Sequence, residues 1–554
     1  MKRQNKFLVL FLTICMAVSM LAACGEKEPK ESTNTPGNQN SSNEGENNNE
    51  NASAWSWPLA ETKELGVWLA WSNNYTTDPN ELKAIQQIEA NTNVHITWTT
   101  VAGQEASEKF GLMMASGDYP DIVCGLGTYY TGGLVKAYMD GVIQDMTDLI
   151  PKYMPTYQGL RTSAEKLQKD TQTDDGRLLG AYILASKNGE VMGERAWDGM
   201  CLRQDWLNDL NLPVPTTIDD WHNVLKAFKD NYSTCEAPLL IGAQNGYDIC
   251  HSFLSAYGVL GEFYQENNVV KFGPLEDGYK QWVQLFHDWY AEGLIDPNFI
   301  TNDAAMMGSA DYMGTGKGGA SANIWGCTAD IWKSYTDDED FWLVAAPAPV
   351  LNEGDIPQIG YNMSEPVKGS DTVLSNNCKD VELACRWIDY WYTDECMFLD
   401  SLGIEGESYV DNGDGTYSIG DAIHAQIDNG EFPSVPEAIY GQYTLGTSDF
   451  GLYNWDMFTP MYEGNPATAA YDVWDANKTD LMLPSFMTMT DEESVSYNSL
   501  YTAIKTLVQE NTIKFITGSR PIEEYDSFIA DLKSYGIEEC IGYKQAALDR
   551  YNAR

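Results

Sequence analysis

Two short motifs are the first places to look for chemistry in this sequence. Gly314, Gly316 and Gly319 satisfy the G-x-G-x-x-G pattern of a dinucleotide site, which has to lie between a strand and a helix. Here a stretch that is not strand-like precedes the glycines, so we expect a flexible loop. The run from Asp411 to Gly415 departs from the EF-hand spacing, because glycines stand at positions 413 and 415. Its Asn-Gly and Asp-Gly pairs are hairpin signals, which favour a surface turn over a metal site, and a structural calcium stays open.

The histidines and serines show no pattern of a catalytic centre. The five histidines are scattered, and none begins an H-E-x-x-H motif. A G-x-S-x-G serine is absent as well. A pair of catalytic carboxylates stays open in so acidic a chain, since glycosidase pairs are defined by their distance in space. Apart from that open alternative, we expect no catalytic residue, and we expect no cofactor.

The cysteines do not form an obvious disulfide framework. The chain has 11, of which Cys15 lies in the apolar N-terminal segment and Cys24 follows it. The nine that remain are an odd number, and their spacing shows no C-x-x-C pair. We expect mostly buried thiols, with one bridge, Cys378 to Cys385 or Cys385 to Cys396, left open.

The first 24 residues have the layout of an export signal. Three basic residues precede an apolar run, Phe7 to Val18, which is too short for a membrane span of ~20 residues. The four residues Leu21-Ala22-Ala23-Cys24 resemble a bacterial lipobox, in which the cysteine is lipidated and becomes the new N-terminus. The resemblance implies a signal peptide at residues 1–23 and a lipid anchor at Cys24. The alternative is ordinary signal cleavage beside a chance cysteine.

A polar segment separates the signal from the rest of the chain. Gly25 to Ser53 consists mainly of Asn, Glu, Ser and Gly, and it has too few apolar residues to bury a core. We expect residues 24–60 to be a lipidated, flexible tether. About 30 residues of such a chain reach roughly 30 Å.

Composition limits the partners of the folded part. The chain has 554 residues, 43% of them hydrophobic, which is enough for two or three domains. It carries 34 Lys and Arg against 81 Asp and Glu, a formal net charge of −47. Such a chain repels nucleic acid and anionic lipid, so both are poor partners.

Strand and helix patterns alternate from residue 63 onward, which predicts a mixed sheet covered on both faces. We expect strands at Lys63–Trp71, Val94–Thr99 and Asp121–Cys124, and helices at Pro79–Ala90, Gln104–Ala115 and Gly132–Met139. Asp78 is the expected cap of the first helix. A further strand is expected within Phe341–Val350.

Several aromatic residues recur at helical spacing and are expected in the core. The helices that carry them contain Trp221, Trp282 and Trp387. We expect two C-terminal helices, one around Tyr497–Val508 and one around Tyr525–Leu532. Ser519 is the expected cap of the second of these helices, and Gly536 its stop.

One longer stretch resembles a known family. Arg203 to Asp230 (RQDWLNDLNLPVPTTIDDWHNVLKAFKD) is similar to the extracellular solute-binding proteins of carbohydrate ABC transporters, in their lipoprotein branch common in Gram-positive bacteria. Other similar segments keep the family order, and together they cover nearly the whole exported part. They are ASGDYPDIV (115–123), GGLVKAYMDGVIQDMTDLI (132–150), YAEGLIDPNFIT (290–301), DYWYTDE (389–395), IEGESY (404–409) and ITG (516–518).

The resemblance implies an α/β fold of the type 2 periplasmic-binding-protein class, with two lobes, a hinge and C-terminal helices. We expect residues 61–180 and 346–410 in the first lobe. Residues 181–345 and 411–554, including the C-terminal helices, are expected in the second lobe. This chain departs from the family pattern in its high cysteine count.

The implied function is that of a lipid-anchored receptor for a neutral carbohydrate, an oligosaccharide. It would work on the outer face of the cytoplasmic membrane as a monomer and hand its ligand to ABC permease subunits. An exported glycoside hydrolase and a peptide-binding lipoprotein are the alternatives.

The candidate ligand residues are aromatic and polar side chains in loops. In two-lobe α/β proteins, ligands meet the loops at the carboxyl ends of strands. Trp or Tyr faces and Asn or Asp groups suit the C–H faces and hydroxyls of sugars. The candidates are Trp71, Asn73, Asn74, Tyr129, Tyr130, Trp197, Tyr247, Asp248, Asn323, Trp325, Tyr361, Asn362, Trp455 and Asp456.

Overall fold

The fold is seen in a computed structural model. The residues it describes are 55–187, 190–191, 195–196, 198–242, 251–301, 312–325, 336–356, 358–359, 363–446, 450–463, 467–475 and 479–554. In this part of the chain no helix is both long and apolar enough to cross a membrane.

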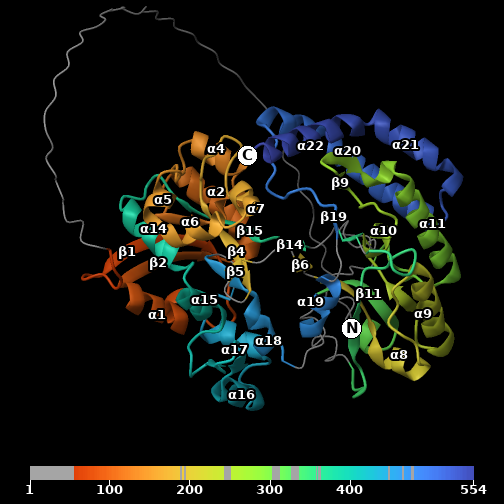
Figure 1. The fold of residues 1–554 in the computed structure, drawn as a ribbon, viewed down its shortest axis with the longest axis horizontal. Helices are drawn as coiled ribbons and strands as arrows, with labels where there is room; N and C mark the ends of the chain where they lie inside the picture. The colour runs from red at the N-terminus through yellow and green to blue at the C-terminus, as the bar shows by residue number, and fades with distance from the viewer. Residues whose placement is uncertain are drawn as a thin grey trace, which may run out of the picture. The chain divides into compact units, whose positions relative to one another are not determined.

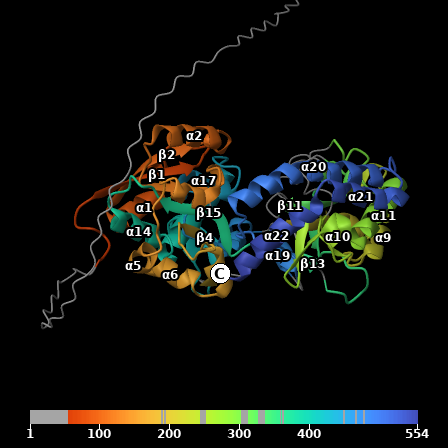
Figure 2. The same ribbon diagram turned by 90° about the horizontal axis from the view of Figure 1, so that it is seen from above.

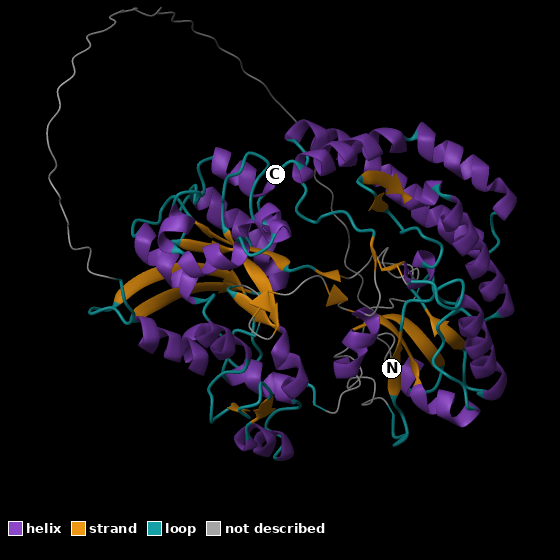
Figure 3. Ribbon diagram, viewed as in Figure 1, coloured by secondary structure: helices purple, strands orange, loops and turns teal. Residues whose placement is uncertain are grey.

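A seven-stranded mixed sheet forms the first half of the architecture. Its main path runs β18-β4-β15-β3-β1-β2, and β5 pairs with β4. β1 is parallel to β2 and β3, whereas β15 runs antiparallel to β3 and β4. Helices lie on both faces of this sheet (Figures 1 and 3). The strands are β1 (Lys63–Ala70), β2 (Val94–Val101), β3 (Ile122–Cys124), β4 (Ala181–Lys187), β5 (Glu190–Val191), β15 (Val367–Leu374) and β18 (Leu452–Asn454).

The expected elements at the start of the chain are confirmed with one difference. β1 pairs with β2 in register from Lys63–Val94 to Ala70–Val101. The expected helix at residues 79–90 is divided, because Leu82 is extended (φ −74°, ψ 134°) between a 3₁₀ turn and α1. The Asp78 side chain caps that turn by accepting a hydrogen bond from the Asn80 amide at 2.9 Å. The helices that follow are α1 (Lys83–Thr92), α2 (Ala106–Ser116), α3 (Leu126–Tyr129), α4 (Gly133–Met139), α5 (Leu149–Tyr153), α6 (Pro155–Arg161) and α7 (Glu165–Asp170).

A four-stranded sheet of order β12-β7-β11-β8 forms the second half. α9 packs against β8 and β11, and its N-terminus carries a capping box between Thr217 and Asp220. The strands are β7 (Asp198–Arg203), β8 (Ala237–Leu240), β11 (Gly318–Trp325) and β12 (Leu343–Ala346), and the helices are α8 (Gln204–Leu210), α9 (Ile218–Asn231), α10 (His251–Ser255) and α11 (Asp277–Glu292). The strand predicted within residues 341–350 is therefore confirmed.

The aromatic residues expected in the core are buried. Trp221 is fully buried, and Trp282 and Trp387 are 1% exposed. Trp221 contacts Phe253 edge to face, and Trp282 packs against Phe286. Such rings contribute most of the buried apolar area of a core.

Short strand pairs and helices complete the chain. The strand pairs are β9–β10 (Phe263–Glu266 with Val269–Phe272), β13–β19 (Gln358–Ile359 with Thr479–Asp480), β14–β6 (Met363–Ser364 with Arg195–Ala196) and β16–β17 (Tyr409–Asp411 with Tyr417–Ile419). The helices are α14 (Val381–Tyr390), α15 (Asp394–Ser401), α16 (Asp421–Asp428), α17 (Val435–Gln442), α18 (Phe458–Met461) and α19 (Ala467–Asp475).

The C-terminal part has three helices where we expected two. α20 (Asp491–Ile516) packs against α11, α21 and α22, and Figure 2 shows α20, α21 and α22 seen from above. α21 spans Tyr525–Ser534 and α22 spans Ile537–Asn552. Gly536 (φ +91°) ends α21 and also starts α22, which explains the missed helix. Ser519 does not cap α21, because a 3₁₀ turn at Ile522–Glu524 precedes that helix.

The lobe boundaries expected from the sequence stay a prediction, and the pairing of two strands bears on them. β4 begins at residue 181, where we expected the second lobe, yet it pairs with β15 in the first sheet. β18 lies in the range 411–554, and it also belongs to the first sheet. The sequence does not indicate these pairings, because β4 pairs with β15 and β18, which both lie far from it along the chain.

Candidate functional site

The end of β1 opens directly into a polar pocket. The Trp71 amide still donates to the Val101 carbonyl at 2.8 Å, and the chain then leaves the sheet. The pocket has a volume of about 500 Å³, within the range of small-molecule sites. Three predicted ligand residues, Trp71, Asn73 and Asn74, line it together with Ser72 and Tyr75.

The other wall of this pocket comes from α17 and the loop after it. The residues that line it there are Glu437, Tyr440, Gly441, Leu445 and Gly446. They lie more than 360 residues from Trp71 in the sequence, and no short-range pattern connects the two segments. The sequence analysis missed these five residues for that reason.

Two hydrogen bonds fix the walls to each other. The Trp71 Nε1 donates to the Leu445 carbonyl at 2.9 Å, and the Asn73 Nδ2 donates to the Tyr440 carbonyl at 2.7 Å. Trp71 is 7% exposed, so its ring has one orientation and shows only a margin to the pocket. At Gly441 a Cβ atom would lie 2.6 Å from the Tyr75 ring, so this close approach requires glycine.

The groups in the pocket suit a neutral ligand with many hydroxyls. The Ser72 hydroxyl and the Asn74 amide can donate and accept hydrogen bonds, and the Glu437 carboxylate can accept them. Burial and a hydrogen bond to the neighbouring Glu437 carboxylate raise the pKa of Tyr75, so its phenol stays protonated and donates to that carboxylate. The aromatic rings of Tyr75 and Tyr440 add apolar faces.

Four other candidates are described but lie outside this pocket. Tyr129 packs edge to face on Trp68 with ring centroids 5.5 Å apart, in the core above the first sheet. The Tyr130 hydroxyl donates to Asp140 at 2.7 Å, and burial together with this carboxylate raises the pKa of Tyr130 to about 12. Trp455 is 3% exposed and contacts Tyr453 and Tyr471, while Asp456 is half-buried beside it. Their role in ligand binding stays a prediction.

The remaining candidates cannot be placed. Trp197, Tyr247, Asp248, Tyr361, Asn362 and Cys24 lie outside the described residues. Asn323 and Trp325 lie in β11, but their side chains are outside the described part of the structure.

The two motifs of the sequence are structural. Thr315 and Gly316 form a turn before β11, and Gly319 lies within that strand, so the glycines do not join a strand to a helix. Asp411 and Asp414 accept hydrogen bonds from the amides of Gly413 and Thr416 in the β16–β17 hairpin. Among the described residues no group of three or more His, Cys, Asp and Glu could hold a metal ion.

Seven cysteines are described, and six of them are buried. Burial raises the pKa of both Cys378 and Cys385 to about 12, so these thiols stay protonated and unreactive. The expectation of mostly buried thiols is confirmed for this part of the chain, and neither of the two bridges left open is formed.

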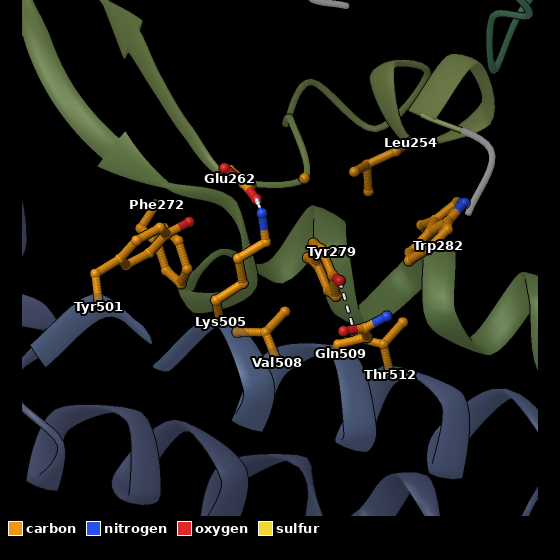
Figure 4. Close-up of a pocket in the computed structure, with 11 residues that line it drawn as sticks. Leu254, Glu262, Phe272, Tyr279, Trp282, Tyr501, Lys505, Val508, Gln509 and Thr512 are labelled. Carbon is orange, nitrogen blue, oxygen red and sulfur yellow. Dashed lines mark hydrogen bonds and ion pairs between the residues drawn. The ribbon is translucent and has the colours of Figure 1, made fainter. Parts of the chain in front are cut away.

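A second, apolar pocket lies between α11, α20 and the loop before β9 (Figure 4). Its volume is only about 50 Å³, and core residues such as Trp282 and Phe272 form its walls. The Tyr279 hydroxyl is bonded to Thr512 at 2.9 Å, and Lys505 lies 3.6 Å from Glu262. This pocket is too small and too apolar for a sugar.

Comparison with known proteins agrees with this fold. The family described as bacterial extracellular solute-binding protein matches residues 73–396. The fructooligosaccharide ABC transporter substrate-binding protein FusA of Streptococcus pneumoniae serotype 4 is 24% identical over 570 residues, 98% of each chain.

Solved structures show the same architecture. An extracellular solute-binding protein from Bifidobacterium longum subsp. infantis has a TM-score of 0.70 at 20% identity and covers 89% of this chain and 99% of its own. S. pneumoniae FusA in complex with kestose has a TM-score of 0.64 at 21% identity and covers 89% and 100%. These neighbours have the two-domain α/β fold of the type 2 periplasmic-binding class, which confirms the expected fold. Because the family match spans more than half of the chain, the protein belongs to the bacterial extracellular solute-binding proteins.

Proposed function

We propose that this protein is the substrate-binding component of an ABC importer and captures a neutral oligosaccharide for delivery to a permease. The observation that carries the proposal is the pocket at the end of β1. There Trp71, Asn73 and Asn74 meet Tyr75, Glu437 and Tyr440 in one hollow of about 500 Å³.

The chemistry of this pocket supports a sugar over the other ligand classes. A sugar ring presents hydroxyls in its plane and C–H groups on its faces, which match amides and aromatic rings. The name of the S. pneumoniae relative gives it a fructooligosaccharide ligand, and its structure holds kestose. A neutral ligand also fits the net charge of −47, which disfavours acidic ligands.

Attachment to the cell surface is the second part of the proposal. Leu21-Ala22-Ala23-Cys24 has the pattern of a lipidation site, and the polar segment after it is long enough to clear the lipid headgroups. Two acyl chains on Cys24 would anchor the protein stably on the outer face of the cytoplasmic membrane, and we propose that it works there as a monomer. A receptor that must release its cargo intact needs no acid–base pair, so we propose that it has no catalytic activity.

A thermal-shift panel tests the ligand class. Purified protein is heated with neutral oligosaccharides, acidic oligosaccharides and short peptides, each at several concentrations. We expect neutral oligosaccharides alone to raise the melting temperature, because a ligand that binds only the native state stabilises it. A rise with peptides alone would replace the proposal by peptide binding. Release of shorter sugars during incubation would replace it by hydrolysis.

A further inference from the structure

A third pocket shares no residue with the pocket at the end of β1. It has a volume of about 290 Å³ and lies where the loop after β3, β15 and the segment 485–488 meet. The polar residues in its walls include Thr128, Gln172, Tyr182, Asp371 and Ser485. The volume is close to the lower end of the range for small-molecule sites.

The Asp371 carboxylate in this pocket has one oxygen atom that is buried without a hydrogen-bond partner in the described part of the chain. Asp371, in β15, is 3% exposed, and its Oδ2 accepts a hydrogen bond from the Gly127 amide at 2.9 Å. Its Oδ1 has no hydrogen-bond partner among the described residues. A buried carboxylate oxygen without a hydrogen-bond partner costs folding free energy, and a bound ligand that donates to it would remove this cost. Burial also raises the pKa of Asp371 to about 7.

The charges of the walls disfavour an anion. The Arg177 guanidinium is paired with Asp175 and Asp145 at 2.8 Å each. The Arg554 guanidinium lies 2.8 Å from Asp174 and also donates to the carbonyls of Lys169 and Phe486. Both cations are therefore already paired with carboxylates, so an anionic ligand would gain no charge partner from them.

The backbone around Asp371 leaves room for a ligand. At Gly127 a Cβ atom would lie 2.6 Å from the Asp371 Oδ2, so only glycine lets the amide reach the carboxylate. Gly369 also lines the pocket, and a Cβ atom built there would meet nothing within 4 Å. The pocket therefore has free space next to Gly369, whereas Gly127 is closely packed against Asp371.

We propose that this pocket is a second ligand site, which takes a neutral sugar ring that donates one hydroxyl to the Asp371 Oδ1. The inference rests on the proposed function, because a receptor for oligosaccharides needs positions for more than one ring. The ring belongs either to the captured oligosaccharide or to a second sugar molecule, and the stoichiometry of binding separates the two sources.

Calorimetric titration at pH 8 with the oligosaccharide most stabilising in the thermal-shift panel tests the site. We expect Asp371→Asn to weaken binding about tenfold, because a hydrogen bond to a charged group is roughly twice as strong as a neutral one. Asp389→Asn is the matched control, since Asp389 is 7% exposed and binds the amides of Tyr157 and Thr156 outside the pocket. Its affinity should equal that of the wild type.

A second pair of variants does not depend on the stability of Asp371→Asn. Gly369→Leu adds a side chain at a position that lines the pocket and where a Cβ atom meets nothing within 4 Å, and it should weaken binding at least tenfold. Gly111→Leu is its control, because a Cβ atom there also meets nothing within 4 Å and Gly111 lies outside the pocket.

Each outcome decides something. Full affinity of both Asp371→Asn and Gly369→Leu overturns the second site and leaves the proposed function standing. Weakening by Gly369→Leu alone overturns the role of Asp371. A wild-type protein that binds no sugar overturns the proposed function and this inference together.

Discussion

At the scale of single residues, the structure separates aromatic side chains that line a pocket from those that build the core. Trp71 and Trp282 are both buried, but Trp71 borders a polar pocket of about 500 Å³ and Trp282 borders the core. Burial alone therefore does not reveal which ring serves binding. The surroundings of each ring make the difference.

Replacing Trp71 should affect ligand binding, whereas replacing Trp282 should affect stability. We expect Trp71→Ala to weaken sugar binding by ~1–3 kcal/mol, because the ring holds the Leu445 loop and offers its margin to the ligand. Trp325→Ala should do the same if that ring lies in the site. Trp282→Ala should lower the free energy of unfolding by ~3–5 kcal/mol, since it leaves a cavity. Calorimetry and urea unfolding measure both quantities, and full affinity of Trp71→Ala and Trp325→Ala would remove these two rings from the site.

The Asp371 carboxyl should make stability depend on pH. Its pKa is about 7 in the folded protein, against about 4 in an unfolded chain, so the folded state binds the proton more tightly. The stabilisation is complete below about pH 4 and is lost as the pH rises through 7. Asp371→Asn lacks this loss, and we expect its unfolding free energy relative to wild type to rise by about 2–4 kcal/mol between pH 4 and pH 8. Urea unfolding at both pH values measures it. An equal difference at both would show that this carboxyl is not perturbed.

At the scale of elements, α22 illustrates what the sequence conceals. Ile537, Cys540, Ala547, Leu548 and Tyr551 are buried at helical spacing, so the pattern was present. Gly536 predicts the end of one helix, but it does not exclude that the next helix begins directly after it. The strand β1 and the site residues directly after it could be predicted, because one apolar run and its next three residues are local. The wall from α17 could not, because its position depends on tertiary packing alone.

The end of α22 is held against α7 by a buried contact. The Tyr551 hydroxyl donates to the Asp170 Oδ1 at 2.6 Å, and Lys166 lies 3.2 Å from the other oxygen. We expect Tyr551→Phe to lower the free energy of unfolding by about 1–3 kcal/mol, because a buried carboxylate loses a donor. Tyr535→Phe, at a residue 48% exposed, is the control and should change little. Urea unfolding of both variants measures the difference, and equal stabilities would contradict a structural role of this bond.

At the scale of the whole molecule, family membership and fold follow from the ordered segments that the sequence shares with solute-binding proteins. The ligand does not follow, because specificity depends on side-chain positions that distant parts of the chain fix together. Asn73 and Tyr440 meet through one hydrogen bond, although 367 residues separate them. Only the folded chain shows that both belong to the same pocket.

Membrane attachment belongs to this scale as well. Cys24→Ala removes the thiol that the lipid would modify, so we expect the variant to leave the membrane fraction for the medium or to stall in processing. Cell fractionation followed by mass spectrometry of the N-terminus checks this. A variant that is processed normally and stays with the membrane would show that another element anchors the protein.

The central claim, a receptor that captures a sugar intact, is tested most directly by one titration. The purified protein is titrated calorimetrically with the oligosaccharide that raised the melting temperature most. The ligand is then recovered, and its mass is measured by mass spectrometry. We expect saturable binding, weakened in the variant Trp71→Ala, and recovery of the oligosaccharide at its original mass. The account is contradicted if no neutral oligosaccharide binds, or if the recovered sugar is shorter than the one added.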